Sequence, residues 1–251
     1  VVVGSVDPYA QVAGKGIEKM RRAGVVVEVG VLGEECLELN RRFFTFHRQK
    51  RPYVILKWAQ TVDGYIDADR SYPEQYGKPT WISNELSRRL VHRQRSEEAA
   101  VLIGTNTVCK DNPSLTVREW SGRQPVRLVL DRRNRLDDGL RVKDGSVPTV
   151  IFTEKELAGK AGPEYVQLDF RENVPGQVLN FMYERELQSV VVEGGRQLLQ
   201  AFIDRDLWDE AHVYVGNCWF GGGVRAPRLN NRPRKTELLD NTFLQCFYRC
   251  P

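Results

Sequence analysis

Three uninterrupted apolar runs constrain the fold of this chain more than any other feature of its sequence. They are VLIG at 101–104, VRLVLD at 126–131 and SVVVE at 189–193. A strand with one solvated face alternates apolar and polar residues; because these runs do not alternate, both of their faces are expected to be covered. Segments with helical spacing of apolar residues lie between the runs, and this alternation predicts an α/β fold with a mostly parallel sheet flanked by helices.

The segments around these runs predict the remaining elements. A helix is expected over 84–98, with Leu86, Leu90 and Val91 on its inner side. Turn-rich connectors separate the other apolar runs, as is typical where strands and helices alternate. Further strands are expected over 53–59, 99–104, 149–153, 165–170, 210–216 and 242–250, helices over 175–187 and 196–207, and a loop over 229–241.

The first 49 residues predict a separate unit of alternating strands and helices. A charged stretch, HRQKRP, closes this unit, and its proline favours an extended chain. We therefore expect two domains, residues 1–49 and residues 50–251. The elements expected in the first are strands over 1–4 and 25–32 and helices over 11–24 and 34–47.

Composition and charge exclude several classes of function. Hydrophobic residues make up 41% of the chain and charged residues 28%, which is ordinary for a globular protein. No apolar run approaches the roughly 20 residues that cross a bilayer and no secretory leader is visible, so a cytoplasmic protein without a membrane partner is expected. The net charge of +4 is spread along the chain, which argues against a nucleic-acid partner.

Cysteine and histidine usage predicts no metal site. The five cysteines are odd in number and form no CxxC pair, so free thiols in a reducing compartment are expected. His47, His92 and His212 lie far apart in the sequence and share no metal-ligand spacing. Each is interpreted as a surface or packed histidine.

The stretch SVVVEGGRQLLQAF at 189–202 places a carboxylate and two glycines where a strand gives way to a helix. The first N–H groups of a helix are unpaired and carry partial positive charge, so a glycine turn before the helix suits an anion. Gly194 and Gly195 let the backbone approach a ligand closely, and Glu193 lies beside them. A tight strand-to-helix turn without a ligand is the alternative interpretation.

Two further stretches carry polar groups near strand ends. Lys57 lies in an apolar strand, which costs free energy unless the amine meets a partner or a ligand; an amine that reaches solvent is the alternative. In IGTNTVCKDNPSLTVR at 103–118, hydroxyls and a carboxylate follow a strand, and a short strand is expected to end at Arg118. This set suits a sugar phosphate or a cofactor, and a turn rich in Asx caps is the alternative. Arg95, taken alone, is expected to be solvated.

Five of these stretches resemble one family in order along the chain. ILKWAQTVDGYI, TWIS, RSEEAAVLIGTNTVCKDNPSLTVR, PVRLVLDRRNRL and VVVEGGRQLLQAF are similar to the reductase half of the bifunctional deaminase/reductase of riboflavin biosynthesis. The preceding DPYAQVAGKGIEKMRRAGVVVEVGVLGEECLELNRRF resembles the end of the deaminase half. The resemblance covers nearly the whole chain.

The resemblance implies both a fold and an activity. The reductase domain is expected to be similar to dihydrofolate reductase, with NADPH across the strand ends, preceded by a βαβα fragment of a cytidine-deaminase-like domain. The implied reaction is the NADPH-dependent reduction of 5-amino-6-(5-phosphoribosylamino)uracil to 5-amino-6-(5-phosphoribitylamino)uracil. The intact protein is expected also to deaminate the preceding 2,5-diaminopyrimidine intermediate. A homodimer acting on this small molecule is expected.

The resemblance also assigns roles to individual residues. Positions that match the active site are Lys57, Asp111 and Glu193. Positions that match the cofactor site are Ala59, Trp81, Thr107, Asp111, Gly194, Gly195, Arg196, Gln197 and Leu198. Positions that match substrate contacts are Arg95, Leu115, Arg118 and Glu193.

The chain departs from the family pattern at three places. Pro79 stands where a serine is common, and Arg132 with Arg133 stands where many members have a serine near the adenosine ribose. Arg132 would grip a 2′-phosphate and favour NADPH, or it is a solvated turn residue. The His-x-Glu and Pro-Cys-x-x-Cys set of the zinc deaminases is not in the sequence, so the zinc-binding part is expected to precede Val1 in the intact protein.

Two other functions stay open on the sequence. One is a dihydrofolate-reductase-like enzyme for another pterin or pyrimidine, although the helix over 84–98 offers no clearly inward carboxylate. The other is a non-catalytic nucleotide-binding module, against which Lys57, Asp111 and Glu193 argue, because such a module does not need three charged groups at strand ends.

Overall fold

A computed structural model describes residues 1–9, 14–77, 79–157 and 162–249. The chain divides into two compact units, Val1–Tyr53 with Leu179–Gln188 and Val54–Val178 with Ser189–Pro251. The domain boundary between residues 49 and 50 stays a prediction. Among the described residues, every helix is too short or too polar to cross a membrane.

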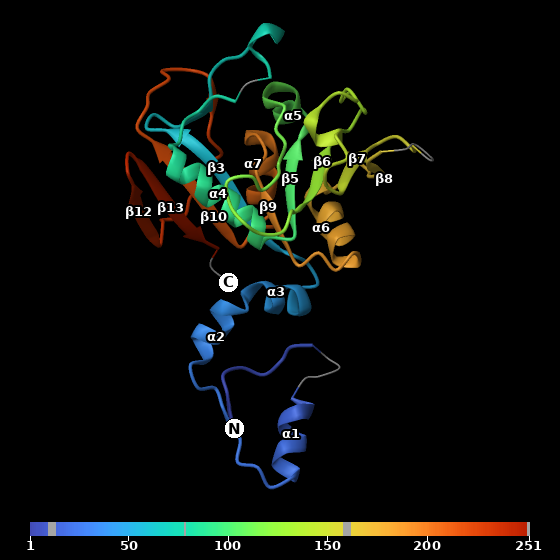
Figure 1. Cartoon of the computed structure of the whole chain (residues 1–251), viewed down its shortest axis with the longest axis vertical. Coiled ribbons are helices and arrows are strands. Elements are labelled where there is room, and N and C mark those ends of the chain that lie inside the picture. Colours follow the sequence, from blue (N-terminus) through green and yellow to red (C-terminus); the bar gives the residue numbers. More distant parts are fainter. Residues whose placement is uncertain (10–13, 78, 158–161, 250–251) are drawn as a thin grey trace. The chain divides into compact units, whose positions relative to one another are not determined.

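The first unit contains short elements near the N-terminus (Figure 1). Its expected helix over 34–47 is two helices, because Asn40 leaves helical geometry and its side chain donates to the carbonyl of Cys36 at 2.9 Å. The strand expected over 25–32 is only two residues long, and residues 11–13 of the first expected helix lie outside the described residues. The elements are β1 (Val2–Val3) parallel to β2 (Glu28–Val29), α1 (Lys15–Arg22), α2 (Gly33–Leu39) and α3 (Arg41–Gln49).

The second unit is built on a nine-stranded sheet of order β12-β13-β10-β3-β9-β5-β6-β7-β8. The pairs β10·β3, β9·β5, β5·β6, β6·β7 and β7·β8 are parallel, and β13 is antiparallel to β10 and to β12. The predicted mostly parallel sheet is therefore confirmed. The strands are β3 (Tyr53–Thr61), β5 (Ala100–Gly104), β6 (Val126–Leu130), β7 (Thr149–Thr153), β8 (Glu164–Gln167), β9 (Ser189–Val192), β10 (Glu210–Gly216), β12 (Lys235–Leu239) and β13 (Thr242–Tyr248).

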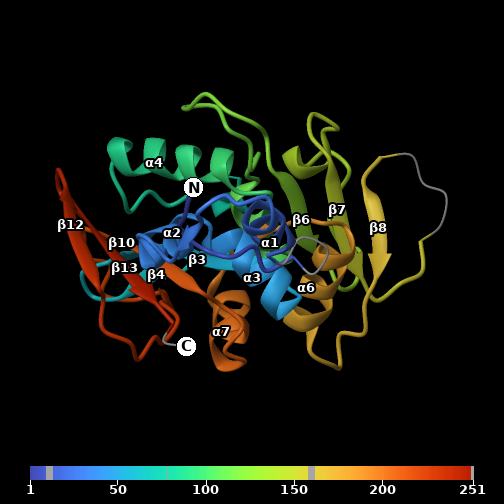
Figure 2. The same ribbon diagram turned by 90° about the horizontal axis from the view of Figure 1, so that it is seen from below.

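Helices complete the fold around this sheet. Figure 2 shows α4 on one face of the sheet and α7 on the other, which explains why the central strands are apolar on both sides. A small antiparallel ladder joins β4 (Tyr65–Asp67) to β11 (Val224–Arg225). The helices are α4 (Glu85–Glu97), α5 (Thr105–Asp111), α6 (Val174–Glu184) and α7 (Arg196–Asp204), with 3₁₀ turns η1 (Pro73–Gln75) and η2 (Arg141–Lys143).

Two expectations about local structure are wrong, and one helix was not expected. The expected loop over 229–241 contains β12, whose pairing with β13 is a long-range contact that local composition does not reveal. Residues 105–111 form α5, for which no helix was expected, and residues 112–125 contain no strand that ends at Arg118. The backbone around Arg118 is instead held by side chains, with Gln124 accepting from the Val117 N–H at 2.7 Å and donating to the Val117 carbonyl at 2.9 Å.

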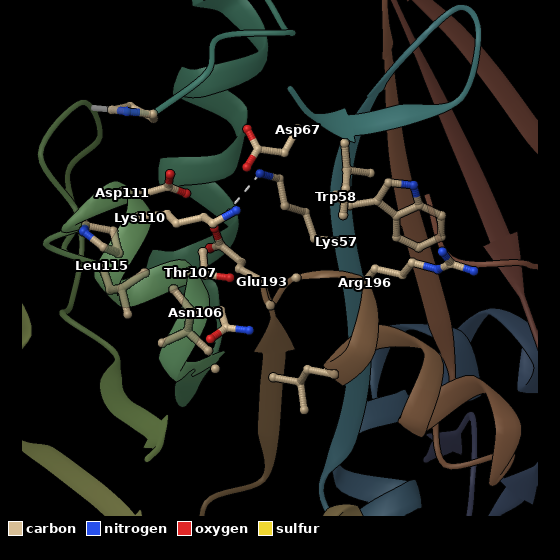
Figure 3. A pocket seen from close by; sticks show the side chains of 18 of the residues that line it. Lys57, Trp58, Asp67, Asn106, Thr107, Lys110, Asp111, Leu115, Glu193 and Arg196 are labelled. Atoms are coloured by element: carbon tan, nitrogen blue, oxygen red, sulfur yellow. Dashed lines mark ion pairs between the residues drawn. The ribbon is translucent and has the colours of Figure 1, made fainter. Parts of the chain in front are cut away.

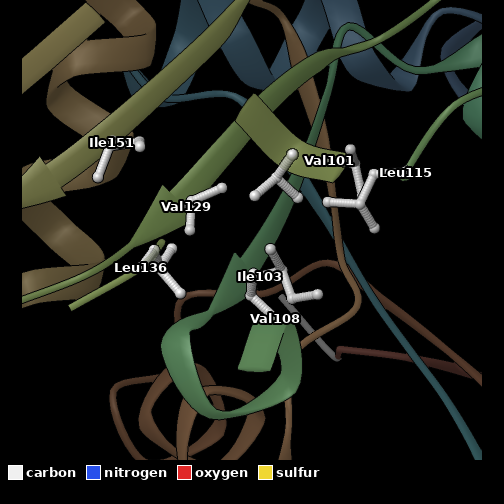
Figure 4. Packing of buried hydrophobic residues seen from close by; sticks show 8 residues of the cluster. Val101, Ile103, Val108, Leu115, Val129, Leu136 and Ile151 are labelled. Atoms are coloured by element: carbon white, nitrogen blue, oxygen red, sulfur yellow. The ribbon is translucent and has the colours of Figure 1, made fainter. Parts of the chain in front are cut away.

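The apolar core beside the site gathers residues from three strands. Val101 and Ile103 alternate along β5, and Val129 and Ile151 lie at matching positions of β6 and β7 (Figure 4). Leu115 joins this cluster and is 2% exposed. Burying a side chain of this size contributes about 1.5–3 kcal/mol, so the cluster fixes the strands whose ends form the site.

The inner face of α4 is more polar than its sequence predicts. Leu86 is 37% exposed, whereas Ser87, His92 and Gln94 are buried together with Val91. Gln94 contacts His212 Nδ1 on β10 at 2.9 Å, so the sheet supplies a polar partner that helical periodicity does not reveal. The expectation for Leu86 is therefore wrong, and that for Val91 is confirmed.

Substitution of Gly216 tests the close approach of β10 to the chain at Ile82. A Cβ at Gly216 would overlap the Ile82 carbonyl oxygen, which is backbone and yields little. Gly216→Ala is expected to lower the free energy of unfolding by about 1–3 kcal/mol in urea titrations. Gly222→Ala is the control, because its Cβ meets nothing within 4 Å; equal stability of the two variants would contradict this packing.

Candidate functional site

A cleft of about 1530 Å³ opens where β5 and β9 end and α5 and α7 begin. Most small-ligand pockets have about 300–1,000 Å³, so this cleft has room for a dinucleotide beside a second molecule. Ligands of open parallel sheets bind at this edge. Every predicted site residue lines the cleft: Lys57, Ala59, Trp81, Arg95, Thr107, Asp111, Leu115, Arg118, Arg132, Glu193, Gly194, Gly195, Arg196, Gln197 and Leu198.

A buried ion cluster lies at the centre of the cleft. Arg95 on α4 donates from Nε and Nη2 to the two oxygens of Glu193 at 2.6 and 2.7 Å. Lys57 on β3 directs its Nζ to Glu193 Oε2 at 3.9 Å, and Figure 3 shows these two side chains pointing toward one another. Three elements distant in sequence therefore meet at one carboxylate. The sequence leaves open that Lys57 reaches solvent and predicts this for Arg95 taken alone, but in the structure both side chains are instead largely buried beside Glu193.

The cluster sets the charge states of its members. Burial would raise the pKa of Glu193, but the charges of Arg95 and Lys57 overcome this effect and lower the pKa to about 2. Burial lowers the pKa of Lys57, and the nearby Glu193 offsets this only in part. Glu193 is thus an anion at any working pH, whereas Lys57 gives up its proton more readily than an exposed lysine.

The glycine turn brings β9 to the start of α7. A Cβ at Gly194 would lie 2.6 Å from Leu198 Cδ2, and one at Gly195 would lie 3.3 Å from Thr107 Oγ1. Neither glycine has a positive φ, so close packing against Leu198 is what requires a small residue at Gly194, whereas a Cβ at Gly195 meets only the Thr107 hydroxyl. Leu198 is buried, and its side chain packs against the turn at Gly194.

The first N–H groups of α7 are available at this turn. In the described part of the chain, the backbone N–H groups of Arg196 and Gln197 have no protein acceptor, and no side chain caps the helix. Unpaired donors at a helix N-terminus form an anion-binding surface.

Asp111 belongs to a second ion network on one wall of the cleft. Arg70 donates from Nη2 to Asp111 at 2.7 Å and to Asp67 at 2.6 Å, and from Nη1 to the Lys110 carbonyl at 3.1 Å. Burial raises the pKa of Asp111, although the Arg70 contact acts in the opposite direction. Asp111 is therefore anchored by Arg70 rather than free in the cleft.

Arg118 lies at another part of the cleft, which is also lined by Glu119 and Arg141. Its Nη1 donates to Thr116 Oγ1 at 3.0 Å. Arg141 lines the same cleft, and its backbone is fixed by Asn112, whose Oδ1 accepts its N–H at 2.9 Å. Burial, then the charges of Arg95 and Arg141, lower the pKa of Arg118, against the opposite effect of Glu119. This excess of positive charge suits an anionic ligand.

The predicted cofactor residues differ in exposure. Trp81 is 62% exposed, with the Arg88 guanidinium 4.6 Å from its ring centroid. Arg132 Nε donates to Glu154 at 2.8 Å near the surface, so part of its guanidinium is already engaged. Pro79 lines the cleft without a hydroxyl or a backbone N–H.

Leu115 lines the cleft at its border with the apolar core. Its side chain lies in the core, and its φ of +55° is uncommon for a leucine. Strained backbone of this kind concentrates at ligand sites.

The cleft also contains residues that sequence reasoning missed. Asp67, Arg70, His92 and Arg141 all line it. The DADR run at 67–70 carried a visible charge pattern, but nothing in the sequence pairs it with Asp111. Among the described residues, no three histidine, cysteine or acidic side chains are grouped to hold a metal ion.

Comparison with known proteins places the chain in a family. The family description "RibD C-terminal domain" matches residues 52–246. The chain belongs to the RibD C-terminal domain family. The predicted family is therefore confirmed.

Individual proteins that are similar in sequence to this chain agree with the family assignment. The riboflavin biosynthesis protein RibD of Aquifex aeolicus is 38% identical over 243 residues, covering 95% of this chain and 67% of that protein. The RibD protein of Bacillus amyloliquefaciens is 35% identical over 249 residues, covering 95% of this chain and 65% of its own length. The chain thus spans about two thirds of these relatives.

Solved structures confirm the α/β fold. A diaminohydroxyphosphoribosylaminopyrimidine deaminase/5-amino-6-(5-phosphoribosylamino)uracil reductase from Thermotoga maritima is similar with a TM-score of 0.87 and 36% identity, covering 100% of this chain and 71% of that one. A riboflavin biosynthesis reductase from Saccharomyces cerevisiae has a TM-score of 0.62 at 18% identity, covering 83% of this chain and 98% of its own. The latter likeness concerns the fold alone.

Removal of Arg95 tests the central ion cluster. Arg95→Ala leaves Glu193 buried beside only Lys57, so the free energy of unfolding is expected to fall by about 3–5 kcal/mol. The matched control is Arg93→Ala on the same helix, which loses an exposed pair with Glu97 and is expected to cost about 0–1 kcal/mol. Urea unfolding measures both, and similar losses would contradict the cluster.

Proposed function

We propose that the protein uses NADPH to reduce 5-amino-6-(5-phosphoribosylamino)uracil to 5-amino-6-(5-phosphoribitylamino)uracil. As a member of the RibD C-terminal domain family, the chain is an oxidoreductase of riboflavin biosynthesis. The observation that carries the detailed proposal is the cleft, in which a glycine turn with free N–H groups lies beside the ion cluster of Lys57, Arg95 and Glu193. The test is loss of NADPH absorbance that depends on this substrate.

The glycine turn fits the diphosphate of NADPH. The N–H groups of Arg196 and Gln197 would donate to its oxygens, and Thr107 closes the opposite side of the turn. Arg132 would meet a 2′-phosphate with the part of its guanidinium that Glu154 leaves available. When bound, NADPH supplies the hydride of the reduction.

The arginines fit the phosphate of the substrate. The guanidinium of Arg95 is largely engaged by Glu193 and also donates to the Thr116 carbonyl at 3.3 Å. Arg118 and Arg141 are therefore the cations best placed for a phosphate, and Arg95 acts mainly by fixing Glu193. Arginine suits this task because its planar group donates two parallel hydrogen bonds.

Lys57 and Glu193 fit the reacting end of the substrate. The ring-opened sugar presents a carbon–nitrogen double bond. When hydride adds to C1′, its electron pair forms the new C–H bond, the π pair of the double bond moves to nitrogen, and nitrogen takes a proton. Lys57 would donate that proton, since burial favours its neutral form. Glu193 would accept hydrogen bonds from sugar hydroxyls or from the aminouracil.

The remaining expectations about the intact protein are also proposals. The first unit is proposed to be the end of a cytidine-deaminase-like domain whose zinc-binding part lies outside this chain, with deamination of the 2,5-diaminopyrimidine intermediate as its reaction. A cytoplasmic location and a homodimeric state stay predictions.

Substitution of Gly195 tests the cofactor site. Gly195→Val keeps an allowed backbone, with φ −67° and ψ 174°, but places a side chain where the diphosphate is proposed to lie. NADPH binding is expected to weaken at least about tenfold, as measured by quenching of tryptophan fluorescence. Gly222→Val, in open space, is the control; unchanged affinity in Gly195→Val would refute this assignment.

Substitution of Arg118 tests the phosphate site. Loss of one charged hydrogen-bond partner costs about 1.5–3 kcal/mol, so Arg118→Ala is expected to raise the KM for the substrate roughly ten- to a hundredfold. NADPH affinity is expected to stay within about twofold. The comparison with dephosphorylated substrate is decisive, because an equal loss with both substrates would exclude the phosphate role.

A further inference from the structure

His92 is a buried residue of the cleft that the reaction does not use directly. It lies on the inner face of α4, is 5% exposed and lines the cleft one turn before Arg95. A buried imidazole with polar surroundings needs hydrogen-bond partners, so its contacts reveal which ring form is present.

The ring accepts a hydrogen bond from the chain at the proposed phosphate site. The backbone N–H of Arg118 donates to His92 Nδ1 at 3.1 Å. An imidazole nitrogen accepts only when it carries no proton, so the proton of the neutral ring lies on Nε2. That nitrogen is 3.9 Å from Glu119 Oε1.

This contact matters because the segment around Arg118 lacks regular structure. Residues 112–125 form neither helix nor strand, so no backbone ladder fixes them. Gln124 bonds both backbone groups of Val117, and from α4 Arg95 donates to the Thr116 carbonyl at 3.3 Å. The tie made at the Arg118 N–H itself is that of His92, and a histidine can lose it by titration near neutral pH.

We propose that His92 is a positioning residue whose neutral ring fixes Arg118 for the substrate phosphate, and that protonation of His92 releases Arg118. The inference rests on the proposed phosphate role of Arg118. A doubly protonated ring presents an N–H to the N–H of Arg118, and two donors cannot bond.

The charged groups around His92 determine the pH at which this happens. Arg95 on its own helix, Arg118 and Glu119 on the facing segment, and Glu193 after β9 face the ring. Burial, then the charges of Arg95 and Arg118, lower the pKa of His92 from 6.5, against the opposite effect of the two carboxylates. The ring is therefore neutral at neutral pH, and the contact is lost only as the pH falls below 6.5.

Two variants of His92 separate its role as a hydrogen-bond acceptor from the space that its side chain fills. His92→Asn keeps an acceptor at the place of Nδ1 but does not titrate, and His92→Leu removes the acceptor. At pH 7.5 the KM for the substrate is expected to rise about tenfold in His92→Leu and to stay within about threefold in His92→Asn, with NADPH affinity unchanged in both. Equal KM values for the two variants would overturn the proposal.

The pH profile gives the second readout. A phosphate monoester itself gains a proton near pH 6, so KM changes with pH in every variant. The ratio of the wild-type KM to that of His92→Asn removes this shared effect. This ratio is expected to increase as the pH falls below 6.5, and a ratio constant from pH 5 to pH 8 would overturn the titration of His92.

Measurements without substrate keep this inference separate from the proposed function. Hydrogen exchange of the Arg118 amide is expected to be at least about tenfold faster in His92→Leu than in the wild type or His92→Asn. Nitrogen NMR of the ring is expected to show the proton on Nε2 at pH 8. A proton on Nδ1, or equal exchange in all three proteins, overturns the role of His92; intact exchange and ring signals with no turnover overturn the reductase assignment instead.

Discussion

The geometry of the site depends on the burial of one carboxylate. Glu193 follows a strand in the middle of the sheet, where an unpaired charge would be strongly unfavourable. Arg95 donates two short hydrogen bonds to this carboxylate, and Lys57 adds a second positive charge. Because removing one partner of a buried pair costs more than the pair itself contributes, β3, β9 and α4 are held to one mutual arrangement.

Around this centre the cleft offers different chemistry to two anions. At the start of α7 the donors are backbone N–H groups, which carry partial positive charge. The two residues that precede them, Gly194 and Gly195, have no side chain. Near Arg118 the donors are full charges on flexible side chains. Under the proposed function, the backbone donors would take the diphosphate and the arginines the phosphate monoester, with Lys57 and Glu193 serving proton transfer and hydrogen bonding.

Some residues of the lining hold the other groups of the cleft in place. Arg70 ties Asp67 to Asp111 across the wall formed by β4 and α5. His92 ties α4 to Arg118, in a segment that has no backbone ladder of its own. Such residues touch no reacting atom, yet the accuracy of the site depends on them, since a flexible loop positions a ligand less well than a strand end does.

The sequence by itself determined most strands of the large sheet and most of the helices, and its resemblance to a known family pointed to many of the residues that line the cleft. Apolar runs such as 189–192 have no stable place except between two helical layers, and a glycine pair after such a run marks a backbone that must approach something closely. Pairings between distant residues were decided only by the tertiary structure. Nothing local to β12 shows that it meets β13, nothing near Arg70 shows that it meets Asp111, and nothing near His92 shows that it accepts from Arg118. The physical reason is that a hydrogen bond or an ion pair forms between whatever groups the folded chain brings together, whereas periodicity reports only whether a residue faces inward.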